Sequence, residues 1–382
     1  MKSVKIFGKS VPLLAIVMIS MLVIGASAYA FVGVASAVTP PGTLTLNYYT
    51  NNDGTGDAVT GLSVYVKTSA GTVVASRGGV SGTTTFTLPA GDYKVTSVKG
   101  ASSRTDGTEV PYTVSSGNDT PVNIPCGELI TSYYTDNKGG AEDGVAVTGV
   151  STYVKWAANN GDVASAGGVN GKTSFALLAG DYKVTSVKGA SSRTDGTVDV
   201  PYTVASTLTA DIPCGKLIVT YYANNNALWG MTGVSVYVKW AANMGDVASA
   251  GGVSGSTSFA LLAGDSAYKV VSVKGASSRT DGPYTVASTQ TADIPVARFR
   301  VVVVKSDFTA QTGVSVYVKT SGGGDVASAG GVSGSVDFSL LQSKDGPGPY
   351  RFIAIKGSTA QADQSANEVP PAGLSGVILM IP

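Results

Sequence analysis

Histidine is absent from this chain, and residues that do acid–base chemistry are few. Without histidine there is no Ser-His-Asp triad and no imidazole ligand for a metal. The glutamates are Glu109, Glu128, Glu142 and Glu368. Two cysteines, Cys126 and Cys214, are too few for a four-cysteine zinc site. The sequence therefore predicts a protein that is not an enzyme and that uses no cofactor and no metal.

Charge is also scarce. Charged residues make up 13% of the chain, and the formal net charge is +1. A protein that binds nucleic acid or anionic lipid through its surface needs a basic patch, and this composition provides none. Glycine is abundant instead, with 49 residues, and serine, threonine and valine are common. That mixture favours strands and tight turns over helices and predicts an all-β fold.

The N-terminus has the pattern of an export signal. Three lysines precede a long apolar run: Lys2, Lys5 and Lys9. The run covers residues 11–25, and small-residue A-x-A patterns follow at 26–28, 28–30 and 35–37. We interpret residues 1–37 as an apolar leader helix that is a signal peptide, and the A-x-A sites favour its cleavage. The alternative is an uncleaved anchor, since 11–37 is long enough to span a bilayer. Both readings predict an extracellular or cell-surface protein that meets the membrane through this segment alone.

The rest of the chain is a fourfold repeat. The phrase "VYVK" or "TYVK" recurs around four tyrosines: Tyr65, Tyr153, Tyr237 and Tyr317. A second phrase, "VAS-x-GGV-x-G", follows each of them. Such periodic self-similarity is the signature of a repeat architecture. The predicted domains are 41–125, 127–213, 215–295 and 297–382, called repeats 1 to 4 below.

One repeat predicts a β-sandwich. Seven short β-prone segments separated by turn residues occur in repeat 1, at 43–50, 62–67, 72–76, 83–88, 92–98, 110–114 and 120–125. This spacing is typical of a seven-stranded, Ig-like or prealbumin-like sandwich. Alternation along 62–67 puts Leu62, Val64 and Val66 in the core. Each Tyr-Tyr pair should likewise have one ring inside and one outside.

The order of these phrases resembles a known family. The run Leu88-Pro89-Ala90-Gly91-Asp92-Tyr93, after a Gly-rich turn and a strand with Phe86, is similar to the sandwich repeats of carboxypeptidase-regulatory-like and Cna-B-type proteins. The resemblance covers each repeat. It implies an extracellular spacer or accessory domain without catalysis. Members of the Cna-B type often form a Lys–Asn isopeptide bond assisted by a glutamate, and the strand that would hold this acid reads Ser97-Val98-Lys99 here.

The connections between repeats are very short. The segments "IPCGELIT" at 124–131, "IPCGKLIV" at 212–219 and "IPVARFRV" at 294–301 pass from one predicted strand into the next. None of them contains the Gly/Ser-rich or Pro-rich stretch of a linker. We therefore expect an extended, stiff rod.

Cys126 and Cys214 occupy equivalent joints, and their state is open. One reading makes them small buried apolar side chains. A disulfide between subunits is a second, and an internal disulfide is a third. In a rod the joints would be on the order of 30–40 Å apart, whereas a disulfide needs Cα atoms within about 7 Å. An internal bond thus requires the repeats to fold back.

The segment "KGASSRTDG" is identical at 99–107, 188–196 and 274–282. It repeats the arginines Arg104, Arg193 and Arg279, each two residues before an aspartate. These arginines are candidates for contact with a glycan or a neighbouring subunit. The alternative is a surface ion pair in a turn, which contributes little to stability.

Trp156 and Trp240 follow the "YVK" strand in repeats 2 and 3. An exposed indole ring stacks on sugars or meets a partner, and the alternative is packing against a neighbouring loop or repeat. Asn118-Asp119-Thr120 is a candidate N-glycosylation site.

Together these features predict a non-catalytic extracellular structural protein: a surface stalk, sheath or filament subunit. Self-association, or association with neighbouring surface proteins, is expected. One mechanism is donor-strand exchange, in which the apolar segment 31–42 adds to an open sheet edge of another subunit. The alternative function is an adhesin or carbohydrate-binding array.

Overall fold

The structure is a computed structural model that describes residues 3–6, 9–12, 39–135, 144–222, 230–264, 267–342, 350–358, 360–366 and 374–381. Near the N-terminus, β1 (Ser3–Ile6) and β2 (Lys9–Pro12) form an antiparallel hairpin. The predicted leader helix and its cleavage sites fall on 13–38, outside these ranges. In the described part of the chain, no helix is long and apolar enough to cross a bilayer.

Repeat 1 is a sandwich of two sheets. One sheet has the strand order β10-β3-β6, and the other has the order β5-β4-β7-β8 with β9 also paired to β7. The strands are β3 (Gly42–Asn47), β4 (Leu62–Thr68), β5 (Val73–Val80), β6 (Thr83–Leu88), β7 (Gly91–Lys99), β8 (Ser102–Asp106), β9 (Tyr112–Val114) and β10 (Asp119–Asn123). The first and last strands, β3 and β10, are parallel neighbours, so the chain leaves the repeat at the end opposite to where it enters.

The same arrangement recurs three times. Repeat 2 consists of β11 (Cys126–Ser132), β12 (Val150–Trp156), β13 (Asp162–Val169), β14 (Lys172–Leu178), β15 (Gly180–Lys188), β16 (Ser191–Asp195), β17 (Tyr202–Val204) and β18 (Thr207–Asp211). Repeat 3 consists of β19 (Cys214–Thr220), β20 (Val234–Trp240), β21 (Asp246–Val253), β22 (Ser256–Leu262), β23 (Tyr268–Lys274), β24 (Ser277–Tyr284) and β25 (Thr289–Asp293). Repeat 4 consists of β26 (Val296–Val304), β27 (Val314–Lys319), β28 (Asp325–Val332), β29 (Ser335–Leu341), β30 (Tyr350–Lys356), β31 (Ala360–Ala366) and β32 (Leu374–Met380).

Repeats 3 and 4 have the predicted seven strands, whereas repeats 1 and 2 have eight. Repeats 1 and 2 have eight because β9 or β17 is a separate strand there, whereas β24 of repeat 3 spans both segments. The strand that the sequence did not predict is β8 or β16 in the "SSRTD" segment, with β24 and β31 as its counterparts, and no apolar alternation announces it. It forms because the preceding strand turns back on itself after a lysine, pairing Lys99 with Ser102 and Lys188 with Ser191. The all-β sandwich class is therefore correct, and the strand count was low for half of the repeats.

Alternation fills the core as predicted. Leu62, Val64 and Val66 are fully buried on β4, while Tyr65 between them is 38% exposed. Of the paired tyrosines, the first ring is buried each time and the second is half-buried: Tyr48 and Tyr49, Tyr133 and Tyr134, Tyr221 and Tyr222. The Tyr48 hydroxyl bonds to Ser97 Oγ across the sandwich at 2.9 Å, which satisfies the one polar atom that the ring brings inside.

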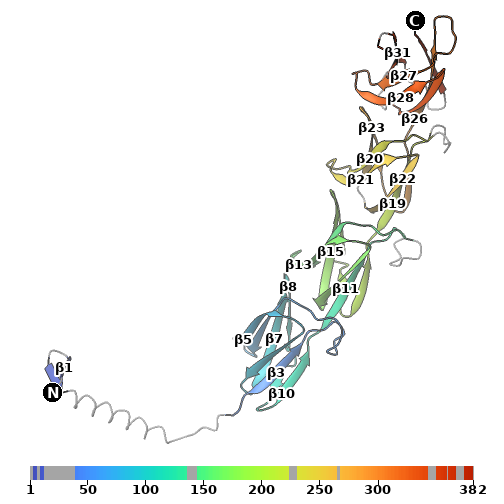
Figure 1. The fold of residues 1–382 in the computed structure, drawn as a ribbon. Coiled ribbons are helices and arrows are strands. Elements are labelled where there is room, and N and C mark those ends of the chain that lie inside the picture. Colours follow the sequence, from blue (N-terminus) through green and yellow to red (C-terminus); the bar gives the residue numbers. More distant parts are fainter. Residues whose placement is uncertain are drawn as a thin grey trace.

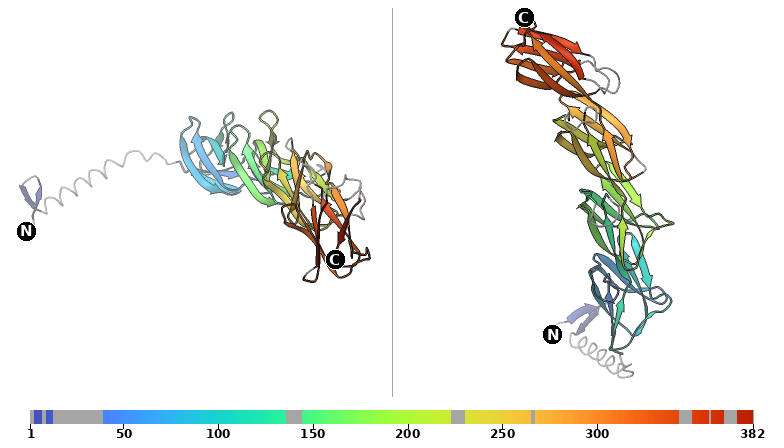
Figure 2. Two further views of the ribbon diagram at one scale, coloured as in Figure 1. Left: turned by 90° about the horizontal axis from the view of Figure 1, so that it is seen from above. Right: turned by 90° about the vertical axis from the view of Figure 1, so that its right-hand side faces the viewer.

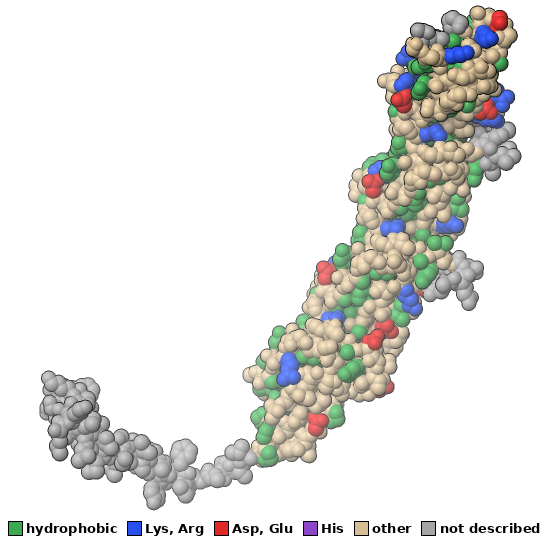
Figure 3. All heavy atoms as spheres, in the orientation of Figure 1, with side chains coloured by type: hydrophobic (Ala, Val, Ile, Leu, Met, Phe, Trp, Pro, Cys, Tyr) green, Lys and Arg blue, Asp and Glu red, His purple; other side chains and the backbone are tan. Residues whose placement is uncertain are grey.

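The four sandwiches follow one another along a single axis and form a rod, with repeat 4 at the far end from repeat 1 (Figures 1 and 2). Charged side chains lie scattered along the rod and form no large patch of one sign on the face in view (Figure 3). Below, the end of each repeat that faces repeat 4 is called distal, and the opposite end is called proximal.

Candidate functional site at the joints between repeats

The most regular feature outside the cores is the joint between successive repeats. At each joint, the distal Lys-Gly-Ala turn of one repeat meets the proximal Gly-Asp-Val segment that opens an edge strand of the next. The alanine N–H of the turn donates to the aspartate carbonyl oxygen each time: Ala101 to Asp162 at 2.9 Å, Ala190 to Asp246 at 2.8 Å, and Ala276 to Asp325 at 2.7 Å. One backbone hydrogen bond thus has the same geometry at all three joints.

Glycine is required at the centre of these turns. Gly100, Gly189 and Gly275 have φ of +54°, +53° and +54°. A Cβ on any of them would lie closer than 3.0 Å to the carbonyl oxygen of the facing aspartate. The turn therefore needs glycine both for its left-handed backbone and for the close approach of the next repeat.

A second backbone hydrogen bond closes each joint on the side of the connecting segment. Ala179 N–H donates to Pro125 at 2.9 Å, and Ala263 N–H donates to Pro213 at 2.9 Å. Gln342 N–H does the same to Pro295 at 3.2 Å. Two separated hydrogen bonds resist both rotation and bending, so the connection is more than a covalent tether.

An apolar pair lies between these bonds. Cys126 and Leu178, a cross-strand pair of repeat 2, both pack into the core of repeat 1. In the same way Cys214 and Leu262 pack into the core of repeat 2, and Val296 and Leu341 into that of repeat 3. Neither cysteine is in a disulfide, and both are fully buried. Burial raises the pKa of each thiol to about 12. Valine in the third joint indicates that this position packs a small apolar side chain.

The repeated arginines also lie at the joints. Arg193 and Arg279 each hold the aspartate two residues on, through Nε and a terminal nitrogen. Each also donates from its other terminal nitrogen to the next repeat, Arg193 to the Ala263 carbonyl and Arg279 to the Gln342 carbonyl at 2.6 Å. Arg104 holds Asp106 in the same way. For Arg193 and Arg279, the observed partner is thus the neighbouring repeat of the same chain.

A tyrosine from the following repeat covers each of the first two joints. Burial raises the pKa of Tyr182, whose neighbours across the joint include Ser102 and Arg104. Burial likewise raises the pKa of Tyr268 to about 12, with Ser191 and Arg193 as its neighbours. The tyrosine hydroxyls donate to Leu178 and Leu262 carbonyls at 2.6 Å, so the polar atoms of these rings are satisfied.

The remaining predicted site residues are Asn118 and the two tryptophans, which lie beside the joint tyrosines. Trp156 and Trp240 are half-buried and pack edge-on against Tyr182 and Tyr268, with ring centroids 5.2 Å apart. Asn118 is exposed in the turn between β9 and β10. Its glycosylation stays a prediction, as does any ligand of the tryptophans.

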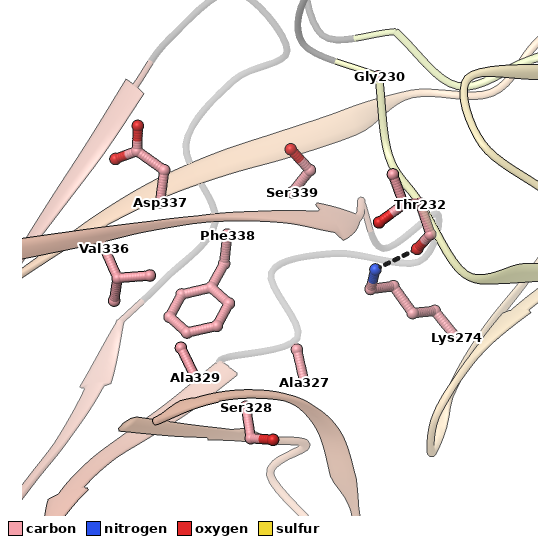
Figure 4. A pocket seen from close by; sticks show the side chains of 10 residues that line it. All are labelled: Gly230, Thr232, Lys274, Ala327, Ser328, Ala329, Val336, Asp337, Phe338 and Ser339. Atoms are coloured by element: carbon pink, nitrogen blue, oxygen red, sulfur yellow. Dashed lines mark hydrogen bonds between the residues drawn. The ribbon is translucent and has the colours of Figure 1, made fainter. Parts of the chain in front are cut away.

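The third joint contains a cleft of about 370 Å³ between repeats 3 and 4. Figure 4 shows side chains of both repeats around it: Gly230, Thr232, Lys274, Ala327, Ser328, Ala329, Val336, Asp337, Phe338 and Ser339. Its two charged groups are engaged, because the Lys274 ammonium donates to the Thr232 carbonyl and Asp337 pairs with Arg298 and Arg300. Over the ranges described, no three metal-binding side chains gather into a cluster.

The sequence pointed to the arginines and cysteines but not to the Gly-Asp-Val segment that accepts the alanine hydrogen bond at each joint. The signal was present: a Gly-Asp pair precedes "VAS" in repeats 2, 3 and 4, whereas repeat 1 has Thr72-Val73 there. The difference marks which repeats have a neighbour on the proximal side.

No protein-family model matches the sequence, and no curated protein matches it either. Three similar solved structures are the TIE protein of Bacillus anthracis (11% identity over 85% of this chain and 69% of that one, TM-score 0.20), the RrgB pilus protein of Streptococcus pneumoniae (9%, 90% and 99%, 0.21) and BcpA, the major pilin subunit of Bacillus cereus (10%, 67% and 99%, 0.19). Pilus proteins are thus among the solved structures to which this chain is similar. TM-scores this low do not establish a shared overall arrangement, so the fold is assigned from the sheets described above.

Proposed function

We propose that this chain is a non-catalytic structural protein, exported to the cell surface, in which four sandwiches form a stiff stalk or filament subunit. The observation that supports it best is the joint. Three successive joints use the same two backbone hydrogen bonds and the same apolar contact. A chain of independent binding modules has no need for such contacts, whereas a spacer that must hold its length does.

Export and assembly belong to the same proposal. The leader pattern at 1–37 would deliver the chain, and cleavage at Ala28 or Ala30 would leave the apolar segment 31–42 free to add to a sheet edge of another subunit. A mature N-terminus at Val38, determined by sequencing the released protein, would remove that segment and with it donor-strand exchange.

The stiffness is tested by small-angle scattering of the full chain. We expect the profile of a straight rod that is the same at low and high salt, since the joints depend on backbone bonds and apolar contact more than on exposed charge. A profile that requires an ensemble of bent and compact shapes would contradict the proposal. Electron microscopy of the same sample shows whether the rods remain single or form fibres.

A further inference from the structure

The two ends of the rod lack the residues that make the internal joints. At the proximal end of repeat 1, Val73 occupies the β5 position that Asp162 occupies on β13. Pro89 follows Leu88 where Leu178 follows Leu177 in repeat 2. Repeat 1 therefore keeps a backbone carbonyl at this position but lacks the Gly-Asp pair and the second leucine of the internal joints.

This proximal end is apolar and open. Val73 and Val74 are 49% and 46% exposed. Val247 and Val326, the counterparts of Val74 in repeats 3 and 4, are only 8% and 7% exposed, since the preceding repeat approaches them. The surface of repeat 1 thus has the shape of a joint face without a partner.

The distal end of repeat 4 has lost the other half. Strand β30 pairs Lys356 with Ala360, so Ala362 and Gln364 stand at the register positions of Arg104 and Asp106 in repeat 1. Gly357 has a left-handed φ of +64°, and a Cβ there would meet no atom within 4 Å. Neither the arginine bond to a next repeat nor the contact with its backbone is provided.

Apolar residues stand at this distal end instead. Phe308 is 71% exposed, and its φ of +62° is a conformation that costs about 1–2 kcal/mol for a residue with a Cβ. It sits in an Asp-Phe-Thr turn that matches Asp53-Gly54-Thr55 of repeat 1, where glycine takes the same conformation. A strained, exposed aromatic residue in place of glycine points to a role outside the fold.

Two more apolar side chains lie beside this turn. Ile378 and Met380 are 57% and 43% exposed on β32. Strand β32 runs parallel to β26 and pairs Ile378 with Val302 and Met380 with Val304, immediately before the turn that holds Phe308. Phe308, Ile378 and Met380 are called the distal apolar tip.

We propose that the distal apolar tip binds the proximal end of repeat 1 in a second copy of this chain, which makes an end-to-end joint between subunits. The internal joints supply the argument, because there a distal end always seats a proximal end of the next repeat. At the outer ends of repeats 1 and 4, exposed apolar residues stand where the internal joints have polar contacts. These apolar residues can pack against each other but do not match the faces of the internal joints. The charges at the two ends also favour this joint. Lys67 in repeat 1 has no counterpart of the aspartate that pairs with Lys155 and Lys239, and Asp307, beside Phe308 in repeat 4, is exposed.

This inference rests on the proposed role as a filament subunit and is tested on the full chain after release of its leader. Electron microscopy and analytical ultracentrifugation measure end-to-end association. Val73→Asp introduces the aspartate that repeats 2, 3 and 4 have at this position, and Phe308→Gly introduces the glycine of repeat 1, Gly54. Each should weaken association about tenfold or more, since a buried apolar contact is lost. Val110→Asp, at a valine that is 78% exposed in the loop after β8, is the matched control and should change nothing.

Unchanged association in both variants would overturn the inference, as would rods that meet only side by side or that remain single at every concentration. None of these results bears on the stiffness of a single rod, so they would leave the proposed structural role unchanged. Bent or collapsed particles in the unaltered protein would instead count against the proposed function itself. Thermal unfolding of each variant, followed by circular dichroism, confirms that the repeats remain folded.

Discussion

At the scale of the residue, burial separates the arginines that lock the joints from those that do not. Arg279 and Asp281 each expose 9% of the side chain, and Arg279 also donates to Gln342. Arg351 and Asp363 form an ion pair with 45% and 31% exposure. A pair in water contributes about 0–1 kcal/mol, whereas removal of one member of a buried pair leaves the other charge unpaired.

We therefore expect Arg279→Ala to lower the free energy of unfolding by about 3 kcal/mol and to loosen the third joint. Arg351→Ala, the matched control in repeat 4, should leave it nearly unchanged, because its ion pair is exposed to water. Chemical denaturation measures the stability, and small-angle scattering measures the bend. Equal losses in the free energy of unfolding would show that the position at the joint does not strengthen the Arg279–Asp281 pair.

The buried thiols give a second prediction at this scale. Their raised pKa of about 12 and their complete burial mean that very little thiolate is available in the folded chain. We expect Cys126 and Cys214 to react with iodoacetamide only after denaturation, and a non-reducing gel to show a monomer. Rapid modification of the folded protein, or a disulfide-linked dimer, would favour the bond between subunits instead. Mass spectrometry identifies the modified residue.

At the scale of the element, the same β-turn has different surroundings in different repeats. Gly189 and Gly357 are both left-handed glycines in the turn after a strand that ends in lysine. Only Gly189 is pressed against another repeat, at Asp246. The cost of the left-handed backbone in the turn can therefore be measured separately from the cost of the close contact at the joint.

Gly189→Ala and Gly357→Ala should both cost about 1–2 kcal/mol for the left-handed backbone. Gly189→Ala should cost about 1 kcal/mol more, because its methyl group collides with the Asp246 carbonyl, and it should also widen the range of shapes seen by scattering. A Gly189→Ala rod as straight as the Gly357→Ala rod would mean that the second joint does not depend on this approach. Denaturation curves provide the two free energies.

At the scale of the whole molecule, buried acids that are held neutral should make the rod sensitive to alkali. Burial raises the pKa of Tyr221 and Tyr268 from 10.0 to about 12 and that of the thiols from 9.0 to about 12. The folded state therefore binds these protons more tightly than the unfolded chain does, and its stability falls as pH rises through this range.

We expect the melting temperature to be constant from neutral pH to about 8, below the pKa of the thiols in the unfolded chain, and to fall steadily toward pH 12. Circular dichroism follows melting, and tyrosinate absorbance follows ionisation in the same samples. A melting temperature that holds through pH 12 would contradict the assigned burial.

Local alternation by itself determined the sandwich cores, since side chains along a strand must alternate between its two faces, and Leu62, Val64 and Val66 followed that rule. The recurring phrases determined that the chain repeats four times, and the short connecting segments determined that no flexible linker separates the repeats. The rotation of one repeat on the next depends on contacts between turns about sixty residues apart, such as Ala101 with Asp162, which no local pattern encodes. Only the tertiary structure decided that Arg193 and Arg279 bond to the next repeat, and that the outer ends of repeats 1 and 4 expose apolar residues where the internal joints have hydrogen bonds across them.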